Sequence, residues 1–260
     1  MSRFKIATLA LAAVVGATGI LAPDPLRWWL LGGLAGTYLA LVGLGATFSG
    51  WEFFGPAICR GRPGGMRLSL TFDDGPDPAS TPRLLEVLEQ HQVKAAFFLI
   101  GRHAERHREL VQAIAAKGHL VGNHTYRHAW WTNFLWGDRL DREIQRAQQV
   151  FKDILGTAPR FFRSPMGLTN PHLFGALKRI GLRFVGWDLR GLDQRSGASA
   201  PVIRRLANRC RDGSIILLHD GGANPQVLVD IVRSIIPALR NQGFTFVRLD
   251  ESLSLPEKEN

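Results

Sequence analysis

The sequence predicts an α/β fold, in which an irregular seven-stranded parallel (β/α) barrel follows a two-helix transmembrane hairpin. Two long runs without charged residues, both within residues 1–50, predict the hairpin. From Met66 onward, short apolar runs alternate with amphipathic helical patterns, as in a parallel sheet covered by helices. Strands are expected at 67–72, 94–100, 119–123, 160–163, 183–187, 214–218 and 244–248. In such a barrel, functional side chains lie at the carboxyl ends of the strands.

The chain of 260 residues divides into three parts. We expect membrane-anchoring segments at 1–50, a linker rich in Gly, Pro and Arg at 51–65, and one globular domain at 66–255. A domain of that length buries about 70% of its unfolded surface, which is enough for a real core. The two cysteines, Cys59 and Cys210, lie in unlike contexts and are expected to be free thiols without a catalytic role.

The first uncharged run spans residues 6–23, and after a polar break the second spans 28–50. The second run is long enough to cross a bilayer as a helix. Tryptophans bracket it as interfacial anchors do, at Trp28, Trp29 and Trp51. The first run has two alternative interpretations. Besides a membrane-spanning helix, it could be a secretory signal, with Arg3 and Lys5 as its basic start, or part of a buried hairpin in a soluble protein.

Basic residues flank the hairpin on both sides, and one lies in its turn. They are Arg3 and Lys5 before it, Arg60, Arg62 and Arg67 after it, and Arg27 in the turn. The positive-inside rule therefore predicts that both ends lie in the cytoplasm, with the domain at the cytoplasmic face of the inner (plasma) membrane. Cleavage of the first run would not alter this, because the second run would then stop transfer. A single run used as an uncleaved anchor would instead place the domain outside.

The helices of the domain have clear start and stop signals. Residues 80–82 and 170–171 are expected starts, because each places a proline in a first helical turn. Helix ends are expected at Gly118, Gly181 and Gly243. In 138–155 an apolar stripe at helical spacing predicts a core-facing helix, through Leu140, Ile144, Ala147, Phe151 and Ile154.

Two adjacent carboxylates follow the first expected strand. Residues 71–76 read Thr-Phe-Asp-Asp-Gly-Pro, and the Gly-Pro pair forces a turn, so Asp73 and Asp74 lie where the strand ends. Carboxylates in this position can divide the work of metal-dependent hydrolysis: one holds a cation while the other accepts a proton from water. The alternative is an ordinary Asp-Asp-Gly-Pro turn.

A pair of histidines follows the third expected strand. His124 and His128 are four residues apart and can reach one ion from a single turn. Together with Asp74 on a neighbouring strand, they make a suitable ligand set for Zn²⁺ or another borderline divalent metal, with positions left for water and substrate. By itself, the histidine pair could also be a chance arrangement at the surface.

Three further segments complete an ordered set of motifs: Arg-Ser-Pro-Met-Gly at 163–167, a stretch from Trp187 to Asp193, and Leu-Leu-His-Asp at 217–220. With the two earlier motifs, the chain resembles a polysaccharide deacetylase with a NodB-homology domain, carbohydrate esterase family 4, over about residues 66–250. The resemblance implies a barrel of NodB type. It also implies a hydrolase that acts on carbon–nitrogen (not peptide) bonds and removes an N-acetyl or N-formyl group from an amino sugar.

The resemblance also implies roles for individual residues. Asp73 would be the general base, paired with Arg163. His219 would be the general acid, oriented by Asp193.

The resemblance further implies that Asp74, His124 and His128 bind a divalent metal ion, with Zn²⁺ as the favoured ion.

Two positions depart from the pattern of the family. Met166 stands where the family usually has an aromatic residue, and Gln194 stands where it usually has a tryptophan. Both positions shape the wall that binds sugar, so they bear on the polymer substrates usual for the family and not on the hydrolytic machinery.

Other features bear on partners. Asp188 and Asp220 are expected to support neighbouring groups or cap helices. The aromatic stretch at 129–136 either begins a buried helix, or dips into the membrane interface and admits a lipid-linked sugar. The net charge of +10 favours anionic lipid head groups. No nucleic-acid-binding module and no protein partner are evident.

The leading hypothesis is therefore a membrane-anchored, metal-dependent deacetylase. Its partners would be the lipid bilayer and an N-acylated amino sugar, in a glycan or a lipid-linked sugar. One rival is an O-acetyl esterase on envelope glycans, because the same machinery attacks esters. Another is a catalytically silent, membrane-bound glycan-binding protein.

Overall fold

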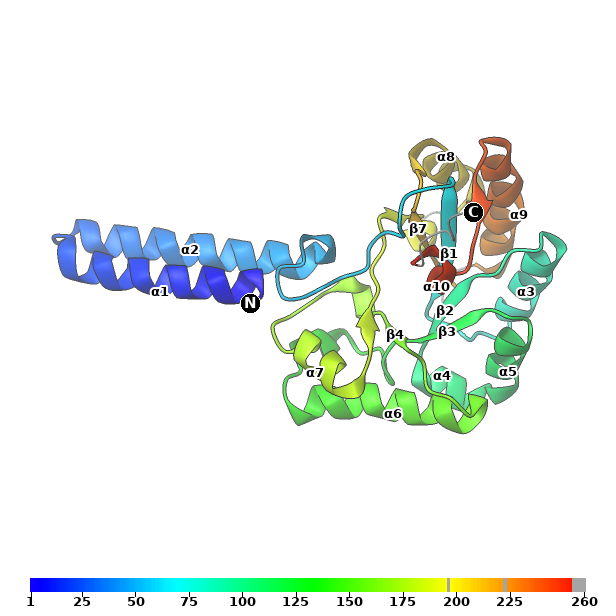
Figure 1. Cartoon of the computed structure of the whole chain (residues 1–260), viewed down its shortest axis with the longest axis horizontal. Helices are drawn as coiled ribbons and strands as arrows, with labels where there is room; N and C mark the ends of the chain where they lie inside the picture. The colour runs from blue at the N-terminus through cyan, green and yellow to red at the C-terminus, as the bar shows by residue number, and fades with distance from the viewer. Residues whose placement is uncertain (196, 222–223, 254–260) are drawn as a thin grey trace, which may run out of the picture.

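The computed structural model describes residues 1–195, 197–221 and 224–253. Two long helices, α1 (Arg3–Leu21) and α2 (Leu26–Thr47), lie side by side and extend away from the α/β domain (Figure 1). Both are long and apolar enough to cross a membrane, and almost all of their residues are at least partly exposed. A core helix of a soluble protein would bury this apolar surface. The structure therefore disagrees with the alternative of a buried hairpin.

The domain contains one curled sheet of parallel strands in the order β5-β4-β3-β2-β1-β7-β6, and β8 pairs with the start of β1 off this path. The strands are β1 (Arg67–Asp73), β2 (Ala96–Leu99), β3 (Leu120–Asn123), β4 (Phe161–Phe162), β5 (Arg183–Phe184), β6 (Leu189–Arg190), β7 (Ile215–His219) and β8 (Thr245–Phe246). The predicted α/β fold is confirmed, as a curled half-barrel. Strand β6 was not predicted, because the stretch from Trp187 to Asp193 mixes charged and apolar residues and contains no apolar run.

The two faces of β1 differ in chemistry. Leu68, Leu70 and Phe72 belong to the main apolar core. The alternate residues Thr71 and Asp73 point to the other face, where both accept a hydrogen bond from a buried arginine. This alternation is the period of two of a strand. It places a polar residue at the carboxyl end of β1.

Helices cover the outside of the sheet (Figure 1). They are α3 (Thr81–Gln90), α4 (Gly101–Arg106), α5 (Arg108–Ala116), α6 (Asp138–Leu155), α7 (Leu173–Ile180), α8 (Ser199–Arg209) and α9 (Pro225–Asn241). The short helix α10 (Leu249–Ser252) instead packs its Leu249 against the inner face of the strands, with Phe98 and Ile215. The predicted helix at 138–155 is confirmed with its buried stripe. Gly181 ends α7 in the left-handed region, with φ 82°. Helix α7 begins at Leu173, three residues after Asn170, whose Oδ1 accepts the Leu173 backbone N–H at 2.9 Å.

The segment expected as a linker runs along the sheet. Ile58 donates its backbone N–H to Phe184 O at 3.1 Å, and Gly61 donates to Gly213 O at 2.8 Å. Residues 58–61 therefore bond both to β5 and to the start of β7. The hairpin also contacts the domain directly, because the Thr169 backbone N–H donates to Ala46 O, near the end of α2, at 2.9 Å.

Candidate active site

The predicted site residues lie at the carboxyl ends of β1, β3 and β7 and in the loops after β4 and β6. A small open cavity of about 70 Å³ lies among them. It is lined by Asp73, Asp74, His124, His128, Met166, Gly167, Trp187, Arg190, Gln194, Leu217 and His219. Two further predicted residues, Arg163 and Asp193, are buried next to this cavity and hold two of its lining side chains. The structure thus brings all seven predicted catalytic and metal-binding residues together.

Asp74 and the two histidines form the centre of the site. Oδ1 of Asp74 lies 3.4 Å from Nε2 of His124 and 3.3 Å from Nε2 of His128. One ligand atom from each residue lies within 4.8 Å of the others, a spacing that one cation can bridge. The backbone of Asp74 adopts φ 75°, in the left-handed region, directly after β1. This turn aims its carboxylate across the sheet toward the histidines.

The histidines are prepared for ligation in different ways. Nδ1 of His124 lies 2.8 Å from Arg163 O, so it donates its proton there and leaves the Nε2 lone pair facing Asp74. Burial lowers the pKa of His128 to about 4, with help from the charge of His124, so His128 is neutral near pH 7. Burial would also lower the pKa of His124, but the Asp73 and Asp74 carboxylates raise it. The raised pKa favours a second proton, on Nε2 of His124. A divalent cation among the same groups would displace that proton.

Asp73 is bound to a completely buried arginine. Nη1 of Arg163 donates to Oδ1 of Asp73 at 2.6 Å and to Thr71 Oγ1 at 2.9 Å. The guanidinium lies 4.1 Å from the centre of the Phe98 ring. Oδ2 of Asp73 lies 3.8 Å from Nε2 of His124, so this second oxygen faces the cluster. A buried charge is tolerated when it is paired and hydrogen-bonded in this way.

His219 stands at the end of β7, across the cavity from the cluster. Its Nδ1 lies 3.0 Å from Oδ1 of Asp193, and its backbone N–H donates to Oδ2 of the same carboxylate at 2.8 Å. Both side chains are nearly buried. Because Asp193 occupies Nδ1, Nε2 is the ring nitrogen left to exchange a proton with a bound molecule.

The donor set fits a divalent metal. Two imidazole nitrogens and one carboxylate oxygen are ligands that Zn²⁺ binds in sites with open positions for water and substrate. Two of these three candidate ligands are also oriented by a hydrogen bond with a residue outside the set. His124 donates to Arg163 O, and Asp74 accepts from Gln194. Such supporting contacts are typical of metal sites.

The two departures from the family pattern occupy different places. Gln194 donates its amide Nε2–H to Oδ2 of Asp74 at 3.0 Å. Because Oδ1 of Asp74 faces the histidines, this hydrogen bond holds the carboxylate with a single oxygen toward the cluster. Met166 lies at the mouth of the cavity with 54% of its surface exposed and an unusual φ of 57°. Gln194 therefore contacts a predicted ligand, whereas Met166 lies at the mouth of the cavity.

Gln194→Leu is expected to weaken metal binding by about 10- to 100-fold, the usual effect of losing a group that orients a ligand. Titration of the metal-free protein against a chelator of known affinity measures this directly. Met166→Leu is the matched control, because Met166 lines the same cavity but is not one of the three clustered residues, and it should leave the affinity unaltered. Equal affinities in both variants would contradict a role for Gln194.

Asp188 and Asp220, which were expected to support neighbouring groups or cap helices, hold neighbouring segments together. Asp188 accepts hydrogen bonds from the Ile215 backbone and the Ser214 hydroxyl, at the start of β7. Asp220 is buried behind the site and accepts hydroxyl hydrogen bonds from Ser80 and Thr81 at 2.6 Å each. It therefore ties the end of β7 to the start of α3.

Asp220 is expected to make stability depend on pH. Burial raises the pKa of its carboxyl from an ordinary 3.8 to about 7, although the Ser80 and Thr81 hydrogen bonds oppose this. The folded protein thus holds this proton more tightly than the unfolded chain. The contribution of the protonated Asp220 carboxyl to the free energy of unfolding is complete below about pH 4. It is lost as the pH rises through about 7.

Asp220→Asn should remove this slope, because an amide does not titrate. Urea unfolding of the full chain in detergent, compared at pH 5 and pH 8, measures the effect. Parallel pH profiles for the wild-type and Asp220→Asn chains would refute it.

Sequence reasoning missed some of the cavity wall. Arg190 lines the cavity because it lies on β6, the strand that was not predicted. Trp187 was noted only as part of a motif, yet its ring closes over Gly167, where an added Cβ would lie 2.2 Å from a ring carbon. Gly167 also has φ 70°, which favours glycine. The signal for this close contact was the glycine after Met166.

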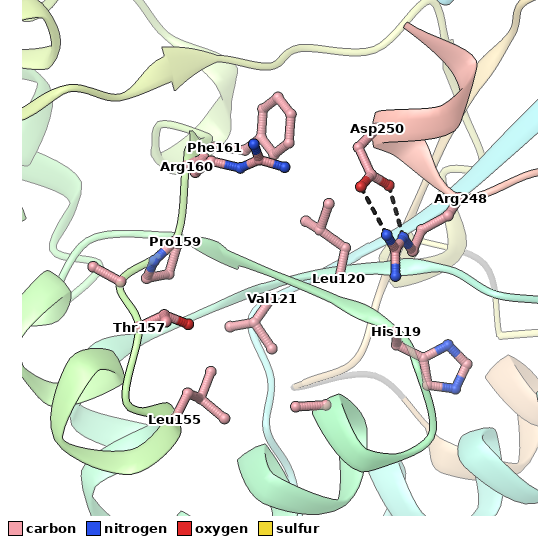
Figure 2. A pocket seen from close by; sticks show the side chains of 12 residues that line it. His119, Leu120, Val121, Leu155, Thr157, Pro159, Arg160, Phe161, Arg248 and Asp250 are labelled. Atoms are coloured by element: carbon pink, nitrogen blue, oxygen red, sulfur yellow. Dashed lines mark hydrogen bonds and ion pairs between the residues drawn. The ribbon is translucent and has the colours of Figure 1, made fainter. Parts of the chain in front are cut away.

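A larger cavity of about 290 Å³ opens at the opposite end of the strands (Figure 2). Figure 2 shows the Arg248–Asp250 ion pair on one side and the apolar side chains of Leu120 and Val121 below it. None of the predicted site residues lines it. The cysteines lie outside both cavities, and burial raises the pKa of each thiol, so both stay protonated.

Comparison with known proteins gives a consistent family. A family model described as polysaccharide deacetylase matches residues 60–185. A peptidoglycan-N-acetylglucosamine deacetylase of Bacillus cereus is 34% identical over 189 residues, which are 72% of this chain and 87% of the relative. A chitooligosaccharide deacetylase of Azorhizobium caulinodans is 34% identical over 188 residues, which are 67% of this chain and 89% of the relative.

Solved structures share the fold. The Bc1960 peptidoglycan N-acetylglucosamine deacetylase superposes with a TM-score of 0.73 at 31% identity, over 78% of this chain and 95% of its own. A family 4 carbohydrate esterase from Streptomyces lividans, solved with acetate, gives 0.64 at 32% identity, over 72% and 92%. BA3943, a CE4 family pseudoenzyme from Bacillus anthracis, gives 0.71 at 24% identity, over 76% and 69%. The last likeness concerns the fold alone.

Proposed function

Because the chain belongs to the polysaccharide deacetylase family of carbohydrate esterases, we propose that it is a metal-dependent hydrolase that removes an N-acetyl or N-formyl group from a membrane-borne amino sugar. One observation carries this proposal. The buried Asp73–Arg163 pair lies next to the Asp74, His124 and His128 cluster, and His219 faces it across one cavity. A protein that only binds glycans has no need of this costly buried pair.

Asp74, His124 and His128 would hold the divalent ion, with Zn²⁺ favoured by the two nitrogen donors. When bound, the ion supplies a Lewis acid that polarises the acyl carbonyl and lowers the pKa of water from about 15.7 toward 7. His124 holds its ligating nitrogen in place through Arg163 O. Gln194 holds the carboxylate of Asp74.

Asp73 accepts the proton of the attacking water through Oδ2, because Arg163 occupies Oδ1. His219 then donates a proton to the departing amine, with its ring held by Asp193. Base and acid lie on neighbouring strands, since β1 and β7 pair directly and Asp73 is in register with His219. The products are an acetate or formate and a free amino sugar.

The acid role of His219 can be tested through the leaving group. His219→Ala is expected to lower hydrolysis of an N-acetyl sugar by about 10²- to 10⁴-fold, because an amine cannot leave without a proton. Hydrolysis of p-nitrophenyl acetate should fall far less, since its phenolate leaves unprotonated. Equal losses on both substrates would contradict this role.

The rival functions separate in one assay. The full chain in detergent is incubated with N-acetylglucosamine oligosaccharides and with an O-acetylated glycan, with added Zn²⁺ and after treatment with a chelator. We expect acetate release from the N-acetyl substrate and its loss on metal removal. Release from the O-acetyl glycan alone would favour the esterase, and release from neither, with glycan binding retained, would favour the silent protein.

We propose further that α1 and α2 anchor the domain in the inner membrane, with the domain at the cytoplasmic face. The basic residues at both ends of the hairpin support this orientation. The substrate would then be a lipid-linked or otherwise membrane-borne precursor and not finished wall polymer. The test fuses alkaline phosphatase or green fluorescent protein to the C-terminus. An active phosphatase fusion together with a non-fluorescent green fluorescent protein fusion would overturn this topology and point to extracellular glycan.

A further inference from the structure

Four large aromatic side chains lie exposed beside the candidate active site. They form an aromatic rim made of Trp130, Trp131, Phe134 and Trp136, with exposed fractions of 67%, 48%, 68% and 69%. Trp130 packs edge-on against both Trp131 and Phe134, so these three rings form one cluster, and the Trp136 ring lies against His172. The expected alternative of a buried helix start is wrong, because these rings point away from the core. An exposed apolar cluster of this size indicates an interaction surface.

The rim adjoins the mouth of the active-site cavity. It follows His128, which lines that cavity, by two residues. Asn133, within the rim segment, donates its Nδ2–H to Pro165 O at 3.2 Å, one residue before Met166 at the mouth. Whatever the rim contacts therefore lies next to the opening through which substrate enters.

The rim also lies close to the end of the hairpin. Asn170 donates to Asn133 O at 2.9 Å, and the neighbouring Thr169 hydroxyl donates to Gly45 O of α2 at 3.1 Å. Helix α2 has 22 residues and so rises about 33 Å, against about 30 Å for the hydrocarbon core of a bilayer. If α2 spans the membrane, its end lies at the bilayer surface. The rim segment, two hydrogen bonds away, then lies close to that surface.

Arginines flank the aromatic rim on the side of α6. A groove of about 350 Å³, called here the arginine groove, has Trp131 in its wall and is lined by Arg127, Arg139, Arg142 and Arg146 and by one acid, Glu143. All four arginines are exposed. Tryptophans beside arginines are the composition of a protein surface at the membrane–water interface, where rings sit at head-group depth and cations meet lipid phosphates.

We propose that the aromatic rim and the arginine groove form a bilayer-contact surface, in which the rim inserts at head-group depth and the groove binds anionic phospholipid head groups. This inference rests on the membrane anchoring proposed above and goes beyond it, since it assigns a second contact between domain and membrane. Hairpin and rim together hold the domain at two points. The active-site mouth is thereby held at the head groups, where the sugar of a membrane-borne substrate lies.

Figure 1 provides a matched control surface. Helix α7, which ion-pairs with the beginning of α6 through Arg179 and Asp141, lies on the side of the hairpin, whereas α3, α5 and α9 lie on the opposite side. Glu109 on α5 is exposed like Phe134. It should not reach the bilayer.

The test uses the full chain in lipid nanodiscs, with Cys59 and Cys210 changed to serine. A fluorophore is attached through Phe134→Cys or, as control, Glu109→Cys, in discs with and without brominated lipids. We expect strong quenching at position 134 and none at 109. Equal exposure of both labels to water, in a chain that inserts into discs, would overturn the contact surface alone.

A second comparison tests the arginine groove. Arg139→Gln with Arg142→Gln should reduce quenching at position 134 in discs rich in phosphatidylglycerol but not in neutral discs, because each arginine at an anionic surface is worth about fivefold in binding. Arg83→Gln with Arg233→Gln removes the same charge from the far side and should change nothing. Unchanged quenching in the Arg139/Arg142 variant would overturn the assignment of the groove to anionic lipid.

The outcomes separate this inference from the proposed activity. Quenching reports how deep the label lies in the bilayer and does not depend on catalysis. An inactive Asp73→Asn chain should therefore give the same quenching. If the wild-type chain shows quenching but no deacetylation, the proposed activity is wrong and the bilayer-contact surface still stands. A chain that stays out of the discs would overturn the anchoring and the surface together.

Discussion

Asp73→Asn is expected to lower turnover by about 10²- to 10⁴-fold while the protein keeps its metal. Asparagine is nearly isosteric and cannot accept the water proton, and Asp73 is not one of the three clustered ligands. His124→Ala and His128→Ala should instead lose metal and activity together, because each removes a donor from a set of three. Asp74→Ala should behave like the histidine variants. Metal content by mass spectrometry and acetate release, measured on the same samples, distinguish the two patterns.

Two results would contradict this division of roles. Tight metal binding by the His124/His128 double variant would show that the ion, if any, binds elsewhere. Loss of metal in Asp73→Asn would make Asp73 a ligand and leave the base unassigned. Met166→Leu serves as the control, because Met166 lines the same cavity and is not one of the predicted catalytic or metal-binding residues.

Arg163→Met is expected to lower the free energy of unfolding by about 3–5 kcal/mol, the usual cost of removing one partner from a buried ion pair. Arg163 has no exposed surface, and its loss leaves the Asp73 carboxylate buried without its cation. The carbonyl of Gly186 also loses its 2.8 Å hydrogen bond from Nη2. Urea unfolding of the full chain in detergent measures the change.

A double variant shows whether the cost comes from the orphaned charge. Asp73→Asn with Arg163→Met should be more stable than Arg163→Met alone, because the buried charge is then removed as well. Arg179→Met is the matched control, since Arg179 forms a bidentate ion pair with Asp141 but its own side chain is 57% exposed, so the pair should contribute little. A small effect of Arg163→Met, similar to that of Arg179→Met, would contradict the buried pair as a stabilising unit.

The site was largely predictable because its residues sit at strand ends. Asp73 and Asp74 end β1, and His219 ends β7, so a parallel sheet must gather them at one edge. The helix at 138–155 was predictable for a similar reason, since an apolar stripe needs a core to cover it. Strand β6 was not, because it has no apolar run of its own and depends on its pairing with β7.

Contacts between distant residues escaped prediction. The hydrogen bond from Gln194 to Asp74 joins positions 120 residues apart, and the sequence indicated only that Gln194 departs from the family pattern. The pairing of residues 58–61 with β5 and the start of β7 was likewise invisible, because a Gly- and Pro-rich stretch has the composition of a loop.

The sequence by itself therefore determined most of the strands and helices, the family, the reactive side chains and the two apolar runs. These depend on local periodicity, turn chemistry and motif spacing, which neighbouring residues carry. Only the tertiary structure decided which oxygen of Asp74 faces the histidines, which ring nitrogen of His219 stays free, and that the aromatic rim lies beside the end of α2. Those outcomes depend on register and packing between segments far apart in the chain. The energies there are shared among many contacts, so no pattern among neighbouring residues predicts the outcome.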